Sequence, residues 1–157
     1  MKTLVIYYTR TGNTKFAAET IAAELGADIE EVIDLKKRQG ITGWLSAGKD
    51  ATGGKKTEIA ETKRDPASYD LIVIGQPVWG GNPTPAIRTY LSKNDLSGKK
   101  VALFFSDVGI GKAVEKTKAL MPNSIFVGGS ELSAKSFKKK EEIREKIVEW
   151  CKTLEST

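Results

Sequence analysis

Short apolar runs alternate along this chain with longer segments in which apolar residues recur at helical spacing. Five runs have the length of strands and lie at residues 4–6, 28–35, 71–74, 101–105 and 125–127. A continuous apolar run, such as the one at 71–74, is typical of a parallel strand that is buried on both faces of a sheet. The run at 28–35 mixes apolar residues with acidic residues, which suits an edge strand with one face exposed to solvent.

Helical segments are predicted between these strands and after the last of them. The final one, over 138–154, has a single apolar stripe made of Ile143, Ile147, Trp150, Cys151 and Leu154. We therefore expect Cys151 to be a core residue rather than a nucleophile. Strands that alternate with helices predict a three-layer α/β domain with a parallel sheet and right-handed crossovers. By length, residues 1–157 form one domain.

Residues 39–57 are harder to interpret. Their spacing of apolar and small residues predicts a short helix, followed by a basic loop. This segment is expected to cover the sheet, and the alternative is that Trp44 approaches a ligand.

Charge and composition narrow the classes of function. The 157 residues carry 25 basic and 20 acidic side chains, a net charge of +5, and include one cysteine and no histidine. A positive excess could attract nucleic acid, an anionic surface or an acidic protein. The basic residues form short clusters without interleaved aromatic residues, so we interpret them as solvated surface and expect no nucleic-acid partner.

The same composition excludes several kinds of chemistry. Without histidine, the chain has no Ser-His-Asp or Cys-His catalysis and no histidine metal site. No apolar run is long enough to cross a bilayer, so no membrane partner is expected. One cysteine rules out an internal disulfide, and the start of the chain has no secretory pattern. We therefore expect a cytoplasmic protein.

The turn after the first strand carries the most specific pattern. Its residues are Thr9, Arg10, Thr11, Gly12, Asn13 and Thr14. Here a strand's carboxyl end meets a helix's amino end, where free N–H groups and the helix dipole favour a phosphate. The spacing of a Walker loop or a dinucleotide turn is absent. The alternative is an ordinary turn in which Thr11 or Asn13 caps the helix.

Two further loops should lie beside this turn, because they follow neighbouring parallel strands. The loop after the third strand contains Pro77, Val78, Trp79, Gly80, Gly81 and Asn82, and the loop after the fourth contains Ser106, Asp107, Val108 and Gly109. A tryptophan between a buried strand and two glycines is well placed to stack on a flat ring. The alternative is a lid packed on the end of the sheet, or a contact with another protein.

Together, Thr-x-Thr-Gly-Asn-Thr after the first strand and Pro-x-Trp-Gly after the third resemble the flavodoxins over essentially the whole chain. The resemblance implies strand order 2-1-3-4-5 and FMN as cofactor. It implies that the first loop binds the FMN phosphate and that Trp79 stacks on the isoalloxazine. The Gly80 carbonyl would accept a hydrogen bond from flavin N5–H after a peptide flip. The third loop would follow the pyrimidine edge of the flavin.

The chain also departs from the family pattern. The tyrosine that often covers the second face of the ring is missing, which leaves Val108 or Ile110 to cover it, or an open face. The short connection between residues 127 and 137 indicates the short-chain class. The chain is basic, whereas well-known flavodoxins are acidic.

The resemblance implies a low-potential electron carrier, a monomer that docks transiently with a reductase and an acceptor protein. No residue suggests a general acid or base besides the flavin. The alternative is an FMN-dependent NAD(P)H:quinone-type reductase that uses an open flavin face. A third possibility is a binding module of the same fold that has lost the flavin.

Overall fold

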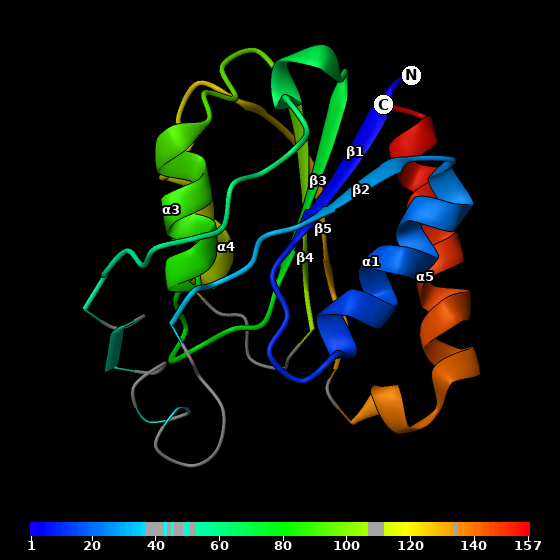
Figure 1. Ribbon diagram of the computed structural model, residues 1–157. Helices are drawn as coiled ribbons and strands as arrows, with labels where there is room; N and C mark the ends of the chain where they lie inside the picture. The colour runs from blue at the N-terminus through cyan, green and yellow to red at the C-terminus, as the bar shows by residue number, and fades with distance from the viewer. Residues whose placement is uncertain (37–42, 44, 46–48, 51–52, 107–111, 134) are drawn as a thin grey trace.

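The computed structural model describes residues 1–36, 43, 45, 49–50, 53–106, 112–133 and 135–157. Its centre is a five-stranded sheet in which every neighbouring pair is parallel and the order is β2-β1-β3-β4-β5 (Figure 1). The strands are β1 (Thr3–Tyr7), β2 (Asp28–Glu31), β3 (Leu71–Gln76), β4 (Lys100–Phe105) and β5 (Ile125–Glu131). The predicted fold class and strand order are therefore confirmed.

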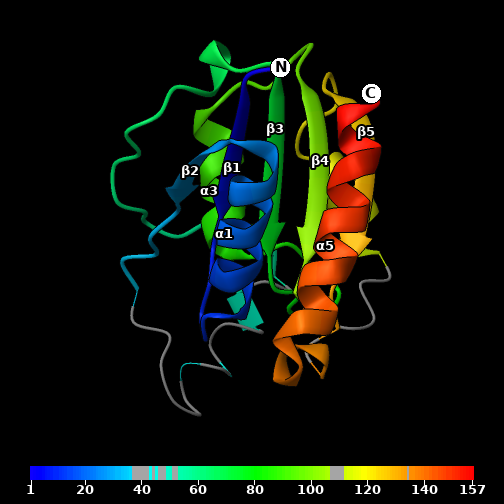
Figure 2. The same cartoon turned by 90° about the vertical axis from the view of Figure 1, so that its right-hand side faces the viewer.

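Helices cover both faces of the sheet. On one face lie α1 (Asn13–Leu25) and α5 (Lys140–Glu155), and on the other lie α3 (Pro85–Lys93) and α4 (Ala113–Lys118) (Figures 1 and 2). Two short 3₁₀ turns, η1 (Pro66–Ser68) and η2 (Ser136–Lys138), precede β3 and α5. No helix in the described ranges is long and apolar enough to span a bilayer.

Each face of the sheet has its own hydrophobic core, because side chains alternate along a strand. Leu4 and Ile6 of β1 belong to the core under α3 and α4, whereas Val5 and Tyr7 belong to the core under α1 and α5. Cys151 is 1% exposed in the second core, as predicted, and burial raises the pKa of its thiol to about 12.

The two edge strands differ from their predicted lengths. β2 ends at Glu31, four residues earlier than predicted, and β5 continues to Glu131. The second half of β5 is Gly128-Gly129-Ser130-Glu131, which has no apolar pattern to announce a strand. Most of residues 39–57, including Trp44, lies outside the described residues, so the helix and loop predicted there remain predictions.

Candidate functional site

The turn from β1 into α1 leaves the amino end of the helix without a side-chain cap. Gly12 is the N-cap residue and has φ +98°, which favours glycine. Its N–H donates to Thr9 Oγ1 at 3.0 Å. Capping by Thr11 or Asn13, the alternative considered above, is not observed in this described turn.

This geometry suits a phosphate group. The first N–H groups of a helix have no intrahelical partner, and the positive end of the helix dipole attracts an anion. The first turn of α1 contains no acidic residue that would repel a phosphate. Nothing lies within 4 Å of the place where a Cβ on Gly12 would be, so a ligand can approach the backbone there. Thr11 is exposed, and Arg10 and Asn13 are half-buried around the same turn. The residues present therefore fit the phosphate of a mononucleotide.

The loop after β3 contains a tight two-residue hairpin. Trp79 N–H donates to the Asn82 carbonyl at 3.3 Å, and Asn82 N–H donates to the Trp79 carbonyl at 3.1 Å. The two residues between them, Gly80 and Gly81, have φ of +58° and +70°. Positive φ at both central positions is the pattern of a type I′ turn, which glycine adopts without strain. Before the hairpin, Pro77 is half-buried and Val78 is buried.

Trp79 is buried, with 8% of its surface exposed. Its indole meets the Tyr8 ring edge to face, with the ring centroids 5.5 Å apart. A planar ligand can stack only on a ring face that is uncovered, so stacking on Trp79 requires the indole to be less covered than it is here. The predicted stacking role therefore stays a prediction. Tyr8 adds an aromatic neighbour that the sequence pattern did not indicate.

The Gly80 carbonyl, predicted to accept from a flavin, has a partner within its own hairpin. Asn82 Nδ2 donates to it at 2.6 Å. Lys116 of α4 in turn donates to Asn82 Oδ1, also at 2.6 Å. Asn82 is 6% exposed, so this hydrogen-bond chain runs from a surface lysine into a buried amide.

A buried glutamine holds the two ends of the same loop. The Gln76 side chain is fully buried at the end of β3, and its Oε1 accepts from both the N–H and the hydroxyl of Thr84. Its Nε2 donates to Thr117 Oγ1 at 3.2 Å. Thr84 is the N-cap residue of α3 and Pro85 the first helical residue. Gln76 thus fixes where the loop leaves the sheet and where it enters the next helix.

The described parts of the three predicted loops meet at the carboxyl ends of β1, β3 and β4. Thr14 of α1 and Ser106, which follows β4, share a buried hydrogen bond of 2.6 Å. Ser106 N–H also donates to the Gln76 carbonyl at 3.2 Å. The other predicted residues of the third loop, Asp107, Val108 and Gly109, lie outside the described residues, as does Ile110.

Sequence reasoning missed the residues whose packing and hydrogen bonds hold these loops in place. They are Tyr8, Gln76, Thr84, Lys116 and Thr117. A polar residue that ends an otherwise apolar strand, as Gln76 does, is the one signal that could have been used, because a buried polar side chain needs partners. Nothing in the local sequence marks Lys116.

The described loops offer hydrogen bonds and aromatic contact rather than proton transfer. They present hydroxyl, amide and backbone groups, with Arg10 and Lys116 as cations. Nearby, burial and the Glu31 carboxylate raise the pKa of the Tyr7 phenol, so it stays protonated. No cluster of His, Cys, Asp or Glu within the described ranges could hold a metal ion. This chemistry suits the binding of a cofactor that supplies its own reactivity.

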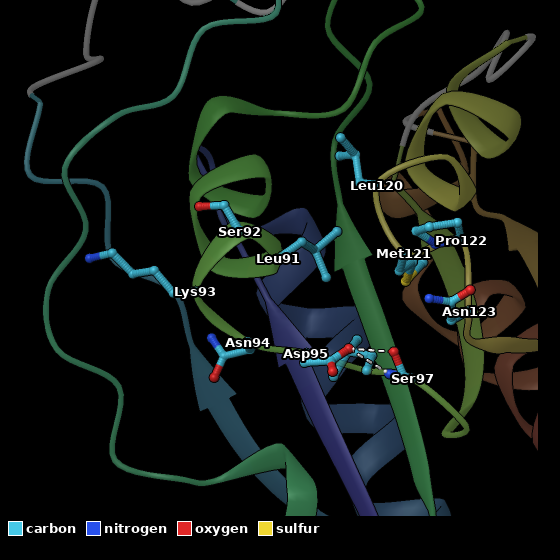
Figure 3. A pocket seen from close by; sticks show the side chains of 11 residues that line it. Leu91, Ser92, Lys93, Asn94, Asp95, Ser97, Leu120, Met121, Pro122 and Asn123 are labelled. Carbon is cyan, nitrogen blue, oxygen red and sulfur yellow. Dashed lines mark hydrogen bonds between the residues drawn. The ribbon is translucent and has the colours of Figure 1, made fainter.

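A separate cavity lies at the opposite end of the strands from the candidate site. It has a volume of about 330 Å³ and lies between the carboxyl ends of α3 and α4 (Figure 3). Its Asp95 carboxylate already accepts hydrogen bonds from the N–H and the hydroxyl of Ser97. The loops that follow β1, β3 and β4 are not part of its lining. The cavity is therefore distinct from the candidate site.

Comparison with known proteins places this arrangement in a family. A flavoprotein from Lactobacillus acidophilus NCFM, solved in complex with FMN, is 29% identical over 89% of this chain and 98% of that chain, with a TM-score of 0.72. The apo form of the flavoprotein from the same organism matches 88% of this chain and 96% of that chain at 29% identity, with a TM-score of 0.67. Oxidised Flavodoxin 2 from Bacillus cereus shares the fold at 23% identity over 99% of both chains, with a TM-score of 0.61. The family model described as Flavodoxin matches residues 2–153, so this chain belongs to the flavodoxin family.

Proposed function

We propose that this chain binds FMN at the edge formed by its three loops and carries electrons between redox proteins. The observation that carries the proposal is the open amino end of α1. It has no side-chain cap and no acidic first-turn residue, and it lies among the hydroxyls of Thr9, Thr11 and Thr14. The similar Lactobacillus flavoprotein, solved with FMN, supports the choice of ligand.

Each loop has a proposed role toward the cofactor. Thr9, Arg10, Thr11, Gly12, Asn13 and Thr14 hold the phosphate. The loop of Pro77, Val78, Trp79, Gly80, Gly81 and Asn82 faces the rings. Ser106, Asp107, Val108 and Gly109 follow the pyrimidine edge. FMN itself supplies the redox chemistry, and the protein binds it and adjusts its potential.

A titration with FMN and with riboflavin tests the binding site. We expect FMN fluorescence to be quenched on binding and riboflavin to bind at least tenfold more weakly, because riboflavin lacks the phosphate. Equal affinity for the two compounds would argue against the phosphate role of the first loop. A lack of FMN binding by folded protein would rule out the whole proposal.

Electron transport rather than catalysis is the function that the described chemistry supports best, since the described residues of the loops offer hydrogen bonds and aromatic contact rather than a proton-transfer group. Sedimentation and NAD(P)H oxidation separate the two. A monomer that does not oxidise NAD(P)H with a quinone acceptor is expected of a carrier. An oligomer with rapid turnover would instead identify a reductase.

We propose that the redox partners are acidic proteins. Lys135, Lys138 and Lys140 are exposed where α5 begins. Lys140 lies over the Phe16 ring of α1 at 5.2 Å, so this basic group adjoins the helix whose amino end is the proposed phosphate site. A basic surface beside the cofactor would attract an acidic partner and speed its association.

A further inference from the structure

We infer that Lys116 is a positioning residue that acts through Asn82. Together they keep the Gly80 carbonyl pointing toward the Asn82 side chain, within its own hairpin. This hold opposes the turn of the carbonyl toward N5 of a bound flavin, and so it lowers the potential of the first electron. The inference rests on the proposed binding of FMN. The hydrogen-bond chain that carries it belongs to the protein alone.

The chain of contacts is short at both links. Lys116 Nζ donates to Asn82 Oδ1, and Asn82 Nδ2 donates to the Gly80 carbonyl, each at 2.6 Å. Among the described residues, the neighbouring acid Glu115 pairs with Lys118, and the Lys116 ammonium has the Asn82 amide as its side-chain partner. A cation on the oxygen of an amide polarises it and makes its N–H groups stronger donors. Lys116 therefore strengthens the bond that holds Gly80.

Among the residues that the structure describes, Asn82 is the hydrogen-bond donor to the Gly80 carbonyl. Gly80 and Gly81 are both at positive φ, and nothing lies within 4 Å of a Cβ built on Gly81. Glycine reaches the alternative backbone conformations without a steric penalty. The hydrogen bond from Asn82 is therefore the main restraint on the direction of the Gly80 carbonyl in the described hairpin.

A flavin that gains its first electron competes for this carbonyl. With a one-electron reductant, such as a reduced viologen dye, and water as the proton source, a bound flavin would take up one electron and one proton, and the proton would bond to N5. The new N5–H needs an acceptor, which Gly80 can offer only if its bond from Asn82 breaks. A stronger hold by Lys116 and Asn82 therefore makes this first step less favourable.

The Lys116→Gln variant tests the inference, with Lys112→Gln as its matched control. Lys112 lies one helical turn earlier on the same exposed surface. Its substitution by glutamine removes the same charge as Lys116→Gln does. The flavin protonated at N5 carries no added charge, so the loss of a lysine charge alone has little effect on the first potential. We expect K116Q to favour the first reduction by about tenfold, a rise of about 59 mV. K112Q should leave it unchanged, and Lys116→Arg should restore the wild-type value.

A second readout does not require the cofactor. In ligand-free, ¹⁵N-labelled protein, the side-chain amide protons of Asn82 should shift and exchange faster with water in K116Q, and should not change in K112Q. An unchanged Asn82 amide in K116Q would overturn the inference, even if FMN binds. If FMN does not bind, the proposed function and the flavin part of the inference both fail, while this spectrum still decides whether the hold exists.

A double variant shows whether Lys116 acts through Asn82. Asn82→Ala should raise the first potential, and the addition of K116Q should raise it no further. Additive shifts would overturn the inference, as would equal shifts in K116Q and K112Q. Because Asn82→Ala removes a buried amide, its fold is checked first by circular dichroism. The single K116Q variant at the surface decides the matter if Asn82→Ala does not fold.

Discussion

The hydroxyls of Thr14 and Ser106 lie 2.6 Å apart and share a buried hydrogen bond between two loops that are distant in the sequence. This contact ties the start of α1 to the end of β4. Since the proposed phosphate loop ends at Thr14 and the proposed pyrimidine loop begins at Ser106, their bond sets the spacing between the two parts of the site.

The Thr14–Ser106 bond should appear as a coupling energy. We expect T14V and S106A each to lower the free energy of unfolding by about 1–3 kcal/mol, since each leaves a buried hydroxyl without its partner. Because both variants lose the same hydrogen bond, the double variant should lose less free energy of unfolding than the sum of the losses in the two single variants. Urea denaturation of the four proteins measures the difference. Costs that add to within about 0.5 kcal/mol would mean that the residues do not interact.

Gly12 should matter both for stability and for ligand binding. G12A places a Cβ at φ +98° and should destabilise the fold by about 1–2 kcal/mol. It should also weaken FMN binding, because the new methyl group lies at the proposed phosphate site. G98A is the control, since Gly98 has φ +73° and open space around it at the far edge of the sheet. An equal loss of FMN affinity in both variants would remove Gly12 from the site.

The hydrogen bonds of the buried Gln76 side chain should contribute substantially to the free energy of unfolding. Q76M keeps the approximate shape of the side chain and removes its bonds to Thr84 and Thr117. We expect a loss of about 2–4 kcal/mol, because the buried N–H and hydroxyl groups would lose their acceptor. Thermal and urea unfolding measure it, with S97A at an exposed turn as the control expected to stay within about 0.5 kcal/mol. A loss that small for Q76M would show that the network is dispensable.

Cys151 should be unreactive in the native state and should make the fold sensitive to alkali. Burial raises its pKa to about 12 from an ordinary value of 9.0. The folded chain therefore holds its thiol proton where the unfolded chain has released it. The stability that this provides is complete below pH 9 and is lost as the pH rises toward 12. Thiol titration with a disulfide reagent at pH 8 should label Cys151 only after unfolding, and rapid labelling of folded protein would contradict this.

The net charge should influence the second reduction potential of bound FMN. Fully reduced FMN carries negative charge, which an acidic flavodoxin repels and a chain of net charge +5 repels less. Two unit charges about 8 Å apart interact by about 2 kcal/mol at an effective dielectric near 20, before screening by salt. We therefore expect a second potential less negative than that of an acidic flavodoxin titrated under the same conditions. A potential at or below that value would refute the charge argument.

The sequence predicted the fold better than it predicted the site. Residues 71–74 and 101–105 form apolar runs that only a buried parallel strand explains well, and both are strands in the structure. The first loop was located by its spacing to the strand before it. The end of β5 was missed because Gly128 and Gly129 of an edge strand carry no alternating pattern.

The supporting contacts of the site could not be predicted, for a physical reason. The bonds of Gln76 to Thr117 and of Lys116 to Asn82 join residues that only the fold brings together. Local spacing contains no information about such pairs. The sequence suggested that Trp79 either stacks on a ligand or packs as a lid, and its burial against Tyr8 depends on packing that no local pattern specifies.

The outer strand β5 bears on how the protein behaves when concentrated. Ile125 and Phe126 are 52% and 36% exposed on a strand with one side open to solvent, which invites a second molecule to add a strand. Its ladder with β4 shifts register, since Val101 pairs with Phe126 and the next residue, Ala102, pairs with Gly128. The extra residue, Val127, interrupts the regular spacing that an incoming strand would need. This irregularity guards the molecule against fibrous self-association.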